Sequence, residues 1–287
     1  MTNASLPFEK PRILAIIQAR MSSTRFPGKV LADIGGQPML ARVVERARRA
    51  KLVDQVVVAT TCDYTDDILA DFCTARKYPS FRGSQFDVLD RFYQTAKVYG
   101  GEVIVRLTAD CPLIDPDLID ETIHAFFWDN AAGSRPSVVN GTSPIIENFS
   151  LENAFDFAAN RLPPPWKRTY PIGLDVEVCS FAGLERAWKE AEQPYQREHV
   201  MPYFYETPGR FKTYILEHVP DYGSLRWTVD TEEDLKLVRE IYRRFDNRDD
   251  FSWREVLMLF EKEPRLAQIN AHVEHKNMGD VDLRHKQ

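Results

Sequence analysis

Short apolar runs alternate with amphipathic segments through the first half of the chain. Three runs, at residues 13–17, 55–60 and 103–107, have the length of one buried strand. The helix predicted after the first run carries apolar residues at helical spacing, namely Met39, Leu40, Val43, Val44 and Ala47. Three strand–helix units in succession predict a parallel sheet with right-handed crossovers.

The pattern changes after about residue 140, where prolines cluster at 163–165. The elements expected beyond that point are a half-exposed strand at 170–178, helices at 184–191 and 198–205, strands at 213–217 and 225–229, a helix from 232 to 245 and another that opens at 252–255. Thr231 is the expected N-cap of the helix at 232. Hairpin-like and longer connections here predict mixed or antiparallel additions to the parallel sheet.

Composition narrows the class of protein. The chain has 287 residues, of which 44% are hydrophobic and 28% charged, as is usual for a soluble globular protein. A net charge of −6 argues against a general nucleic-acid binder, and no apolar run approaches the ~20 residues of a membrane span. The first ten residues do not resemble a secretory signal. The four cysteines show no CxxC pairing, so neither a zinc site nor a disulfide framework is indicated, and a cytoplasmic enzyme is expected.

A cationic loop, residues 18–31, follows the first predicted strand. It carries Arg20, Arg25 and Lys29 among small residues, and Gly28 directly precedes the lysine. Guanidinium groups, an ammonium group and backbone N–H groups together suit a polyanion such as a polyphosphate. Ligands of open α/β sheets bind at the carboxyl ends of the strands, where this loop is expected. The alternative is a basic surface loop, and no GxGxxG supports a dinucleotide fingerprint.

Two aspartates each follow a predicted strand directly, Asp110 in TADCP and Asp230 in TVDTEEDL. Because Thr231 is the more natural helix cap, Asp230 is left for another role. Two carboxylates brought together at this edge suit Mg²⁺, which prefers oxygen ligands and takes further positions from water and substrate phosphates. The alternatives are that each aspartate caps a turn, or that the two form a glycosidase acid and base, which would need no cationic loop.

These three segments together resemble one family. The string ARxxSTRxPGKxL resembles the nucleotide-binding loop of the CMP-sugar synthetases, most closely the 3-deoxy-manno-octulosonate cytidylyltransferases and the spore-coat polysaccharide biosynthesis F-type proteins. The two aspartate segments resemble that family's GDEP-like turn and its VDTPEDL, in the same order. The resemblance implies a three-layer, Rossmann-like sandwich of the nucleotide-diphospho-sugar transferase kind. It also implies transfer of CMP from CTP to a sugar, with release of pyrophosphate, for surface polysaccharide or glycan biosynthesis.

The resemblance also implies roles for particular residues. Arg20, Lys29, Asp110 and Asp230 are the expected catalytic residues, and Asp110 and Asp230 are the expected magnesium ligands. The implied nucleotide-binding residues are Ala19, Arg20, Ser23, Thr24, Arg25, Lys29, Arg82, Gly83, Asp87 and Asp110. The sequence departs from the family where it reads RGSQFD in place of an SGTER-like string, and where Gln18 replaces the usual proline. These departures leave open which sugar is used, and whether CTP, GTP or UTP is preferred.

Six polar residues are candidates for binding the sugar acceptor. They lie beside predicted strand ends or a predicted helix start, and are Arg106, Arg168, Asp175, Glu177, Glu198 and His199. An acidic sugar would pair its carboxylate with an arginine, and its hydroxyls suit Asp175 or Glu177. Each of these residues is alternatively a structural ion pair, and His199 a cap or a general base. Arg226 is expected to be a structural partner.

The expected organisation is a nucleotidyltransferase domain at 1–235 and a C-terminal helical extension and tail at 236–287. Within the domain, 13–135 is the expected nucleotide-binding half and 136–235 the sugar-binding and dimerisation half. The resemblance implies a homodimer, and the aromatic residues 203–205 serve either that interface or the core.

Two rival functions are a glycosyltransferase and a non-catalytic nucleotide-binding regulator. A glycosyltransferase would want a DxD pair near the middle strand, and the nearest here is Asp115-Pro116-Asp117, which a helix start explains better. The presence of both aspartates and all three loop cations speaks against a regulator.

Overall fold

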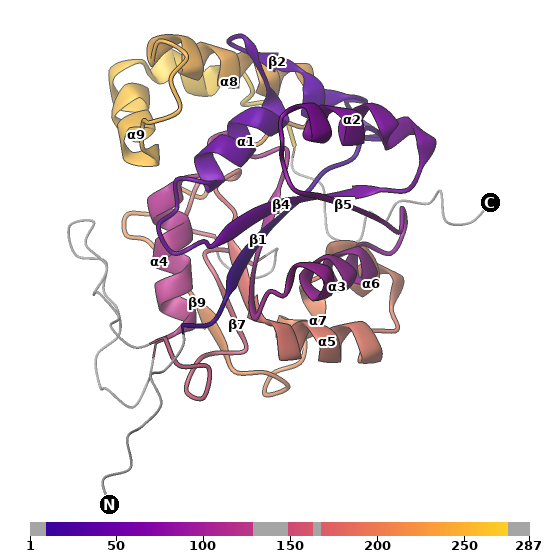
Figure 1. Ribbon diagram of the computed structural model, residues 1–287. Coiled ribbons are helices and arrows are strands. Elements are labelled where there is room, and N and C mark those ends of the chain that lie inside the picture. The colour runs from indigo at the N-terminus through magenta and orange to yellow at the C-terminus, as the bar shows by residue number, and fades with distance from the viewer. Residues whose placement is uncertain (1–9, 129–148, 163–167, 275–287) are drawn as a thin grey trace, which may run out of the picture.

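The computed structural model describes residues 10–128, 149–162 and 168–274. Within these residues a seven-stranded sheet, in the order β5-β4-β1-β6-β8-β7-β9, forms the middle of the molecule (Figure 1). Its strands are β1 (Ile13–Gln18), β4 (Gln55–Thr61), β5 (Ser80–Gly83), β6 (Val103–Thr108), β7 (Phe157–Ala159), β8 (Glu177–Ser180) and β9 (Thr213–Ile215). A separate pair consists of β2 (Asp33–Ile34) and β3 (Gln37–Pro38).

The sheet is mostly parallel, as the sequence predicts. Strands β5, β4, β1 and β6 are parallel neighbours, and Ile16 of β1 is paired with Val57 on one side and Arg106 on the other. Strand β8 is antiparallel to both β6 and β7, and it places Glu177 opposite Arg106. The carboxyl ends of the four parallel strands therefore meet at one edge, together with the beginning of β8.

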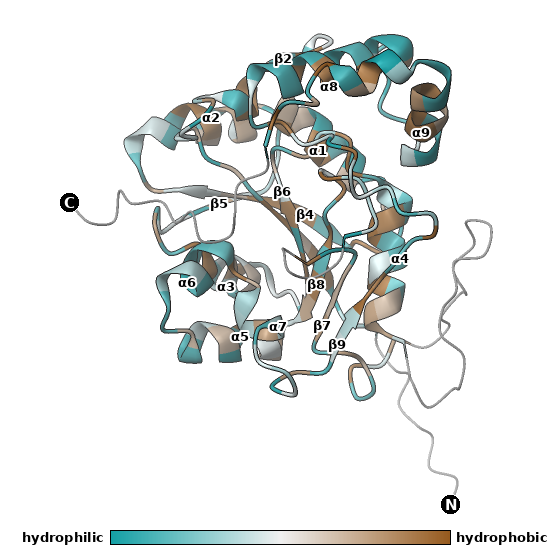
Figure 2. Ribbon diagram, turned by 180° about the vertical axis from the view of Figure 1, so that it is seen from behind, coloured by the Kyte–Doolittle hydropathy of each residue, from teal (hydrophilic) through white to brown (hydrophobic). Residues whose placement is uncertain are grey.

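Helices cover both faces of the sheet. Along β1, Ile13, Ala15 and Ile17 pack into one hydrophobic cluster while Leu14 and Ile16 pack into another, as alternation in a doubly covered strand requires. One face holds α1 (Met39–Ala47), α2 (Asp67–Ala75), α4 (Pro116–Phe126), α8 (Glu232–Arg244) and α9 (Trp253–Lys262). The other holds α3 (Val88–Tyr99), α5 (Phe181–Glu190), α6 (Pro194–His199) and α7 (Pro202–Tyr205). Figure 2 shows hydrophobic residues along the central strands, and the expected three-layer arrangement is confirmed.

Several elements predicted for the second half are wrong in type or extent. The strand expected at 170–178 is confined to β8, and the one expected at 225–229 is reduced to a single bridge between Ile172 and Arg226. A Cβ on Gly173, whose φ is +107°, would lie 2.5 Å from the backbone nitrogen of Thr228, so the close approach of the two segments requires glycine at this position.

The helix expected at 198–205 is instead two short helices, α6 and α7, because Val200 between them has φ of 70°. In the first half, residues 80–83 form strand β5. The Asp63 side chain accepts a hydrogen bond from the Thr65 N–H and begins a 3₁₀ turn at Tyr64–Asp66.

The C-terminal extension packs on the same core as the sheet. Trp253, Phe260 and the nearby Leu266 belong to the hydrophobic cluster that contains Ile13 of β1. The N-cap expected at Thr231 and the helix start expected at 252–255 are both confirmed, and each is a capping box. Helix α8 runs across the expected boundary at 235/236, and the division into domains stays a prediction. The expected tail, from residue 275, lies outside the described residues. In the described segments no helix has the length and apolar character that a bilayer crossing needs.

Candidate active site

The cationic loop begins where β1 ends and returns to its own start. The Met21 carbonyl oxygen accepts hydrogen bonds from the backbone N–H groups of Ser23, at 3.0 Å, and Gly28, at 2.9 Å. Ser23 is half-buried and Thr24 is exposed in this loop, whereas Ala19 beside the last residue of β1 is buried. The small residues of the loop therefore form a compact turn at the carboxyl edge of the sheet.

Asp66, which the sequence did not single out, holds this loop to the neighbouring strand. Its buried carboxylate accepts hydrogen bonds from the Met21 N–H at 2.7 Å, from the Thr60 hydroxyl at 3.0 Å and from the Thr61 hydroxyl at 2.5 Å. A buried carboxylate is stable only with such donors. Asp66 thus fixes the entry to the loop against the end of β4.

Arg20 is half-buried at the start of the loop, near the buried Arg91 of α3. Burial and the Arg20 charge lower the pKa of Arg91 to about 10. Two guanidinium groups thus lie close together at this part of the edge, and the carboxylates of Asp66 and Asp87 oppose the effect of Arg20 on the Arg91 pKa.

Gly28 and the turn after it direct Lys29 inward. Gly28 has φ of 74°, in the left-handed region that glycine adopts without strain, and it begins the 3₁₀ helix η1 (Lys29–Leu31). Val30 of that turn is buried in the core. Because Val30 anchors the turn, Lys29 is buried as well, although it carries a charge.

The Lys29 ammonium bridges the two aspartates. Its Nζ lies 2.9 Å from Asp110 Oδ2, 2.9 Å from Asp230 Oδ1 and 2.7 Å from the Val229 carbonyl oxygen. Burial acts to lower the pKa of Lys29, but the two carboxylates outweigh it, so that its pKa lies above the ordinary value. The lysine therefore stays charged, and its three N–H donors are all directed at these acceptors.

A backbone contact explains why two aspartates so distant in the sequence meet. The Val229 N–H donates to the Asp110 carbonyl oxygen at 2.8 Å, and the Thr228 hydroxyl donates to the same oxygen at 3.1 Å. The segment before α8 is thus held directly against the turn after β6. We refer to Asp110 and Asp230 as the aspartate pair.

Asp230 is held by two further cations. Its Oδ2 lies 2.8 Å from Arg25 Nη2 and 2.8 Å from Arg226 Nη2. Burial acts to raise the pKa of Asp230, but Lys29, Arg25 and Arg226 outweigh it and hold that pKa well below its usual range. The structural role expected for Arg226 is visible in this contact and in its ion pair with Asp234, whose two closest atoms are 2.9 Å apart.

The donor chemistry of the aspartate pair fits Mg²⁺. Asp110 and Asp230 both contact the Lys29 ammonium nitrogen. A metal ion placed near that nitrogen would therefore be within reach of both carboxylates. Among the described residues no group of three or more histidine, cysteine, aspartate or glutamate side chains is placed to hold a metal. Mg²⁺ is commonly held by one or two carboxylates with waters and substrate phosphates in the other positions, which is the set this site offers.

Three more of the residues expected to bind the nucleotide, Arg82, Gly83 and Asp87, lie at the end of β5 and the start of α3. The Arg82 guanidinium is turned onto the adjacent loop, where it donates to the Thr61 and Asp63 carbonyl oxygens at 2.9 and 3.0 Å. Asp87 caps α3 and pairs with Arg197 at 2.5 Å. A Cβ on Gly83 would lie 2.9 Å from the Phe81 ring, so this position requires a small residue. Their contact with a nucleotide stays a prediction.

Four of the residues expected to bind the sugar form two ion pairs, one of which involves β6, the strand that precedes Asp110. Arg106 of β6 is paired with Glu177 of β8, and Arg168 is paired with Asp175, with its closest atoms 2.5 Å apart. Arg161, which the sequence did not single out, lies 3.2 Å from Asp175. Its backbone forms an isolated β-bridge with that of Arg168. This cluster thus contains three arginines and two carboxylates.

The other two candidates, Glu198 and His199, lie at the end of α6 and not at a helix start as expected. Both are half-buried. Tyr203 and Phe204 are buried in the second hydrophobic cluster, so their place is the core, and the expected dimer stays a prediction. Asp115 accepts from the backbone N–H groups of Asp117 and Leu118 and caps α4, as expected for a helix start.

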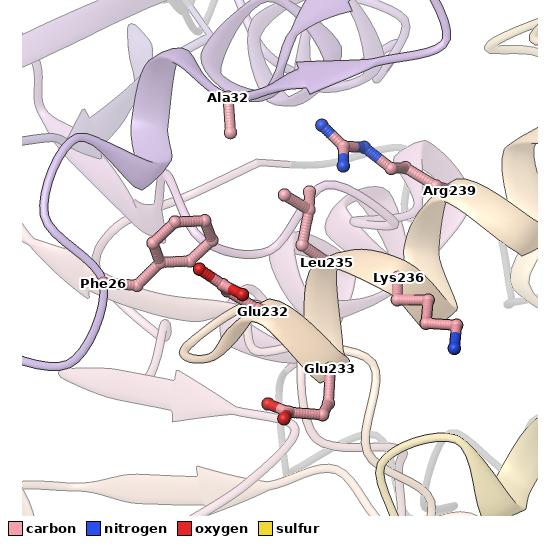
Figure 3. Close-up of a pocket in the computed structure, with 7 residues that line it drawn as sticks. All are labelled: Phe26, Ala32, Glu232, Glu233, Leu235, Lys236 and Arg239. Atoms are coloured by element: carbon pink, nitrogen blue, oxygen red, sulfur yellow. The ribbon is translucent and has the colours of Figure 1, made fainter.

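A pocket of about 640 Å³ lies beside the cationic loop (Figure 3). It is lined by Phe26, Ala32, Glu232, Glu233, Leu235, Lys236 and Arg239. The loop supplies one wall and the start of α8 the other (Figure 3). None of the predicted site residues lines this pocket, so it adjoins the aspartate pair without containing it.

A mostly parallel, mixed sheet with a cationic loop and an aspartate pair at its carboxyl edge defines an α/β protein of the nucleotidyltransferase-like class. The chain belongs to the cytidylyltransferase family, whose model matches residues 14–277.

Similar proteins agree with this membership. The chain is 33% identical over 262 residues to the spore coat polysaccharide biosynthesis protein SpsF of Bacillus subtilis, covering 89% of this chain and 96% of that protein. It is 38% identical over 264 residues to a 3-deoxy-manno-octulosonate cytidylyltransferase of Pelobacter propionicus, covering 82% and 99%. A solved cytidylyltransferase from Leptospira borgpetersenii is 30% identical, with a TM-score of 0.76 over 92% of this chain and all of that one. The family resemblance drawn from the three motifs is confirmed.

Proposed function

We propose that the protein transfers CMP from CTP to a hydroxyl group of an acidic sugar, with Mg²⁺, and releases pyrophosphate. Family membership supports the cytidylyl donor, and the relatives named for octulosonate and for spore-coat polysaccharide support an acidic sugar and polysaccharide biosynthesis. The observation that carries the proposal is the convergence of Asp110 and Asp230 on Lys29 beside the cationic loop. The two carboxylates suit a metal ion, and the cations of the loop suit the phosphates of a nucleoside triphosphate bound to that metal.

The reaction is a displacement at the α-phosphorus of the nucleotide. The sugar hydroxyl oxygen forms the new bond to phosphorus, the bond to the β-phosphate oxygen breaks, and the hydroxyl proton is lost to solvent or a nearby base. Mg²⁺ held by the aspartate pair would neutralise phosphate charge and acidify the attacking hydroxyl group. The protein contributes mainly alignment and charge neutralisation.

The position of Lys29 indicates how it takes part. Its three donors point to Asp110, Asp230 and the Val229 carbonyl oxygen, so it has to turn before it can donate to a phosphate. Neutralisation of the two carboxylates by a bound cation would free the Lys29 ammonium to face the departing pyrophosphate. Arg25, which is exposed and paired with Asp230, is placed to make the same change of partner.

The arginine cluster supports an acidic acceptor. Arg106, Arg161 and Arg168 outnumber Asp175 and Glu177 by one positive charge in a mostly buried region. A buried excess of positive charge is costly unless an anion joins it. The carboxylate of a sugar acid is an anion of suitable size, and bidentate pairing with a guanidinium favours it.

Two expectations accompany the proposal. The protein is expected to act in the cytoplasm and as a homodimer formed through its C-terminal half. Size-exclusion chromatography with light scattering tests the dimer directly: a mass near twice the 33.2 kDa of the chain is expected.

A screen of pyrophosphate release tests the function. The four nucleoside triphosphates are each combined with octulosonate, nonulosonate and sugar-1-phosphate acceptors in the presence of Mg²⁺. We expect release with CTP and an acidic sugar, and none when Mg²⁺ is chelated. Tight CTP binding without release over the whole panel would support a regulator, and cleavage of an added nucleotide-sugar would support a glycosyltransferase.

A further inference from the structure

The Asp234 carboxylate, in the first turn of α8, organises the turn that carries Asp230. It accepts hydrogen bonds from the backbone N–H groups of Asp230 at 2.9 Å and Thr231 at 3.1 Å. It also accepts from Arg226 Nε at 2.9 Å and Nη2 at 3.1 Å. The side chain is fully buried, and these donors hold its pKa below the ordinary value although burial opposes that shift. Such a well-satisfied carboxylate fixes the backbone on both sides of Asp230.

Arg226 links Asp234 to the Asp230 side chain. Its Nη2 donates to Asp230 Oδ2 at 2.8 Å while the same guanidinium is held by Asp234. Of the cations around Asp230, Arg25 is exposed and Lys29 belongs to the cationic loop, whereas Arg226 is buried in the same segment as the aspartate. Arg226 therefore holds Oδ2 of Asp230 from within the same segment, while Lys29 holds Oδ1 from the cationic loop.

The C-terminal extension supplies the remaining donor. The side-chain amide of Asn270, Nδ2, donates to Asp234 Oδ1 at 2.8 Å and to the Arg226 carbonyl oxygen at 3.0 Å. Asn270 is buried, 4% exposed, and follows the 3₁₀ helix η4 (Pro264–Gln268). One amide thus contacts both members of the Arg226–Asp234 pair from outside their segment.

The same extension also contacts the turn that follows Asp110. The Trp253 N–H donates to Asp115 Oδ2 at 2.8 Å, while Asp115 Oδ1 caps α4. The Phe260 ring packs on Trp227 with centroids 5.5 Å apart, next to Arg226. The extension is therefore attached to both segments that bring the aspartate pair together.

We propose that Asn270 is a positioning residue, through which the C-terminal extension sets the orientation of Asp230 for metal binding. The inference rests on the proposed function, because it assigns Asp230 a metal. Loss of the amide donor leaves Asp234 Oδ1 and the Arg226 carbonyl oxygen short of a buried partner. The Arg226 guanidinium then shifts, and Asp230 with it. Groups that orient a metal ligand in this way typically change metal affinity by about 10- to 100-fold when removed.

The test compares three variants with the intact protein. Asn270→Leu removes the amide at similar size. Leu266→Ala is the matched control for stability, because Leu266 is a buried apolar anchor of the same extension. Gln268→Leu repeats the new side chain at an exposed position two residues earlier. Binding of Mn²⁺ in the presence of CTP is followed by the electron paramagnetic resonance signal of free Mn²⁺, and binding of CTP without metal is followed by calorimetry. Neither measurement requires the sugar.

We expect Asn270→Leu to weaken Mn²⁺ binding about tenfold. Its metal-free CTP affinity should stay within about twofold of the intact protein, because no nucleotide contact has changed. Leu266→Ala should lower the melting temperature at least as much while leaving Mn²⁺ affinity unchanged, and Gln268→Leu should change neither.

Equal Mn²⁺ affinity in Asn270→Leu and the intact protein would overturn the positioning role and leave the proposed function standing. So would a loss in Leu266→Ala as large as that in Asn270→Leu, because it would mark a general effect of stability. Absence of Mn²⁺ binding by the intact protein with CTP would instead overturn the proposed metal and, with it, this inference.

Discussion

The turns that carry Asp110 and Asp230 end at the same ammonium group but are built differently. Counted over the described residues, Asp110 is paired with one cation, Lys29, and Asp230 with three, Lys29, Arg25 and Arg226. The Asp110 side chain is 28% exposed and that of Asp230 is 17% exposed. The backbone N–H of Asp230 is also held by Asp234. Two identical side chains thus have different degrees of constraint, so removing each should have different consequences.

The largest expected effect is on turnover, from Asp110→Asn. The variant keeps the shape of the side chain and loses the charge that faces Lys29. By analogy with loss of a charge contact made mainly in the transition state, we expect kcat to fall by about 10²- to 10³-fold. CTP binding should weaken without being lost, because the cations of the loop are unchanged. Pyrophosphate release and equilibrium CTP binding measure the two effects, and a rate like that of the intact protein would remove Asp110 from the mechanism.

Lys29→Met removes the charge that the two turns share. We expect a loss of turnover of about 10²-fold, from loss of stabilisation of the leaving pyrophosphate. Without nucleotide, Mn²⁺ should bind the variant more tightly than the intact protein, because two carboxylates have lost their common counter-ion.

Lys29→Arg, which keeps the charge, is the matched control for Lys29→Met and should retain weak Mn²⁺ binding. Titration of free Mn²⁺ by electron paramagnetic resonance separates these outcomes. Unchanged metal affinity in Lys29→Met would show that the ammonium and the metal do not share a position.

Asp230→Asn should lower the stability of the fold more than Asp110→Asn does. Asp230→Asn leaves Lys29, the buried Arg226 and the exposed Arg25 each without one anionic partner. Of these three cations, Asp110→Asn affects Lys29 alone. We expect Asp230→Asn to lower the free energy of unfolding by about 2–3 kcal/mol, discounted for partial exposure, and Asp110→Asn by less than about 1 kcal/mol. Urea unfolding measures both. Equal losses would show that the additional cations around Asp230 do not constrain it.

The smallest expected effect is on the pH dependence of stability, and it comes from Glu121, which lies outside both turns. Asp230 contributes little to this dependence near neutrality. Its low pKa means that its contribution to stability is present above the ordinary aspartate pKa and is lost only in strong acid, as pH falls through the folded value. Burial of Glu121, against the opposing charge of Arg254, raises the pKa of Glu121 to about 7. A raised carboxyl pKa makes the folded state less stable as pH rises from about 4.5 through 7.

Glu121→Gln should therefore stabilise the protein more at alkaline than at acidic pH. We expect its advantage in the free energy of unfolding to be larger at pH 8 than at pH 5.5 by about 2 kcal/mol. Unfolding in urea at the two pH values checks this difference. An advantage that does not vary with pH would show that Glu121 is not protonated in the folded protein near neutrality.

The sequence predicted the parts of the site that are contiguous along the chain. The cationic loop, the strands before it and before Asp110, and the cap at Thr231 all follow from local patterns, and the aspartates meet as the order of the motifs suggested. The strand expected at 225–229 is wrong, because this segment makes only a single bridge with Ile172 next to the close backbone approach at Gly173, a long-range contact that no local pattern reveals.

Residues that act through long-range contacts were missed. Asp66 stands in an acidic helix start, Arg161 precedes a run of prolines, and Asn270 follows a short 3₁₀ turn. Each looks like an ordinary capping or surface residue in sequence. Its partner, such as Met21 for Asp66 or Asp234 for Asn270, is identified only when the chain is folded.

The most direct test of the account is a crystal structure of the protein with CTP and Mn²⁺, in which anomalous scattering locates the metal. We expect one manganese within coordinating distance of both Asp110 and Asp230, roughly 2.0–2.6 Å from their oxygens, with Lys29 turned toward the β- and γ-phosphates. A manganese bound away from either aspartate, or a CTP complex in which Lys29 still bridges both carboxylates, would contradict it.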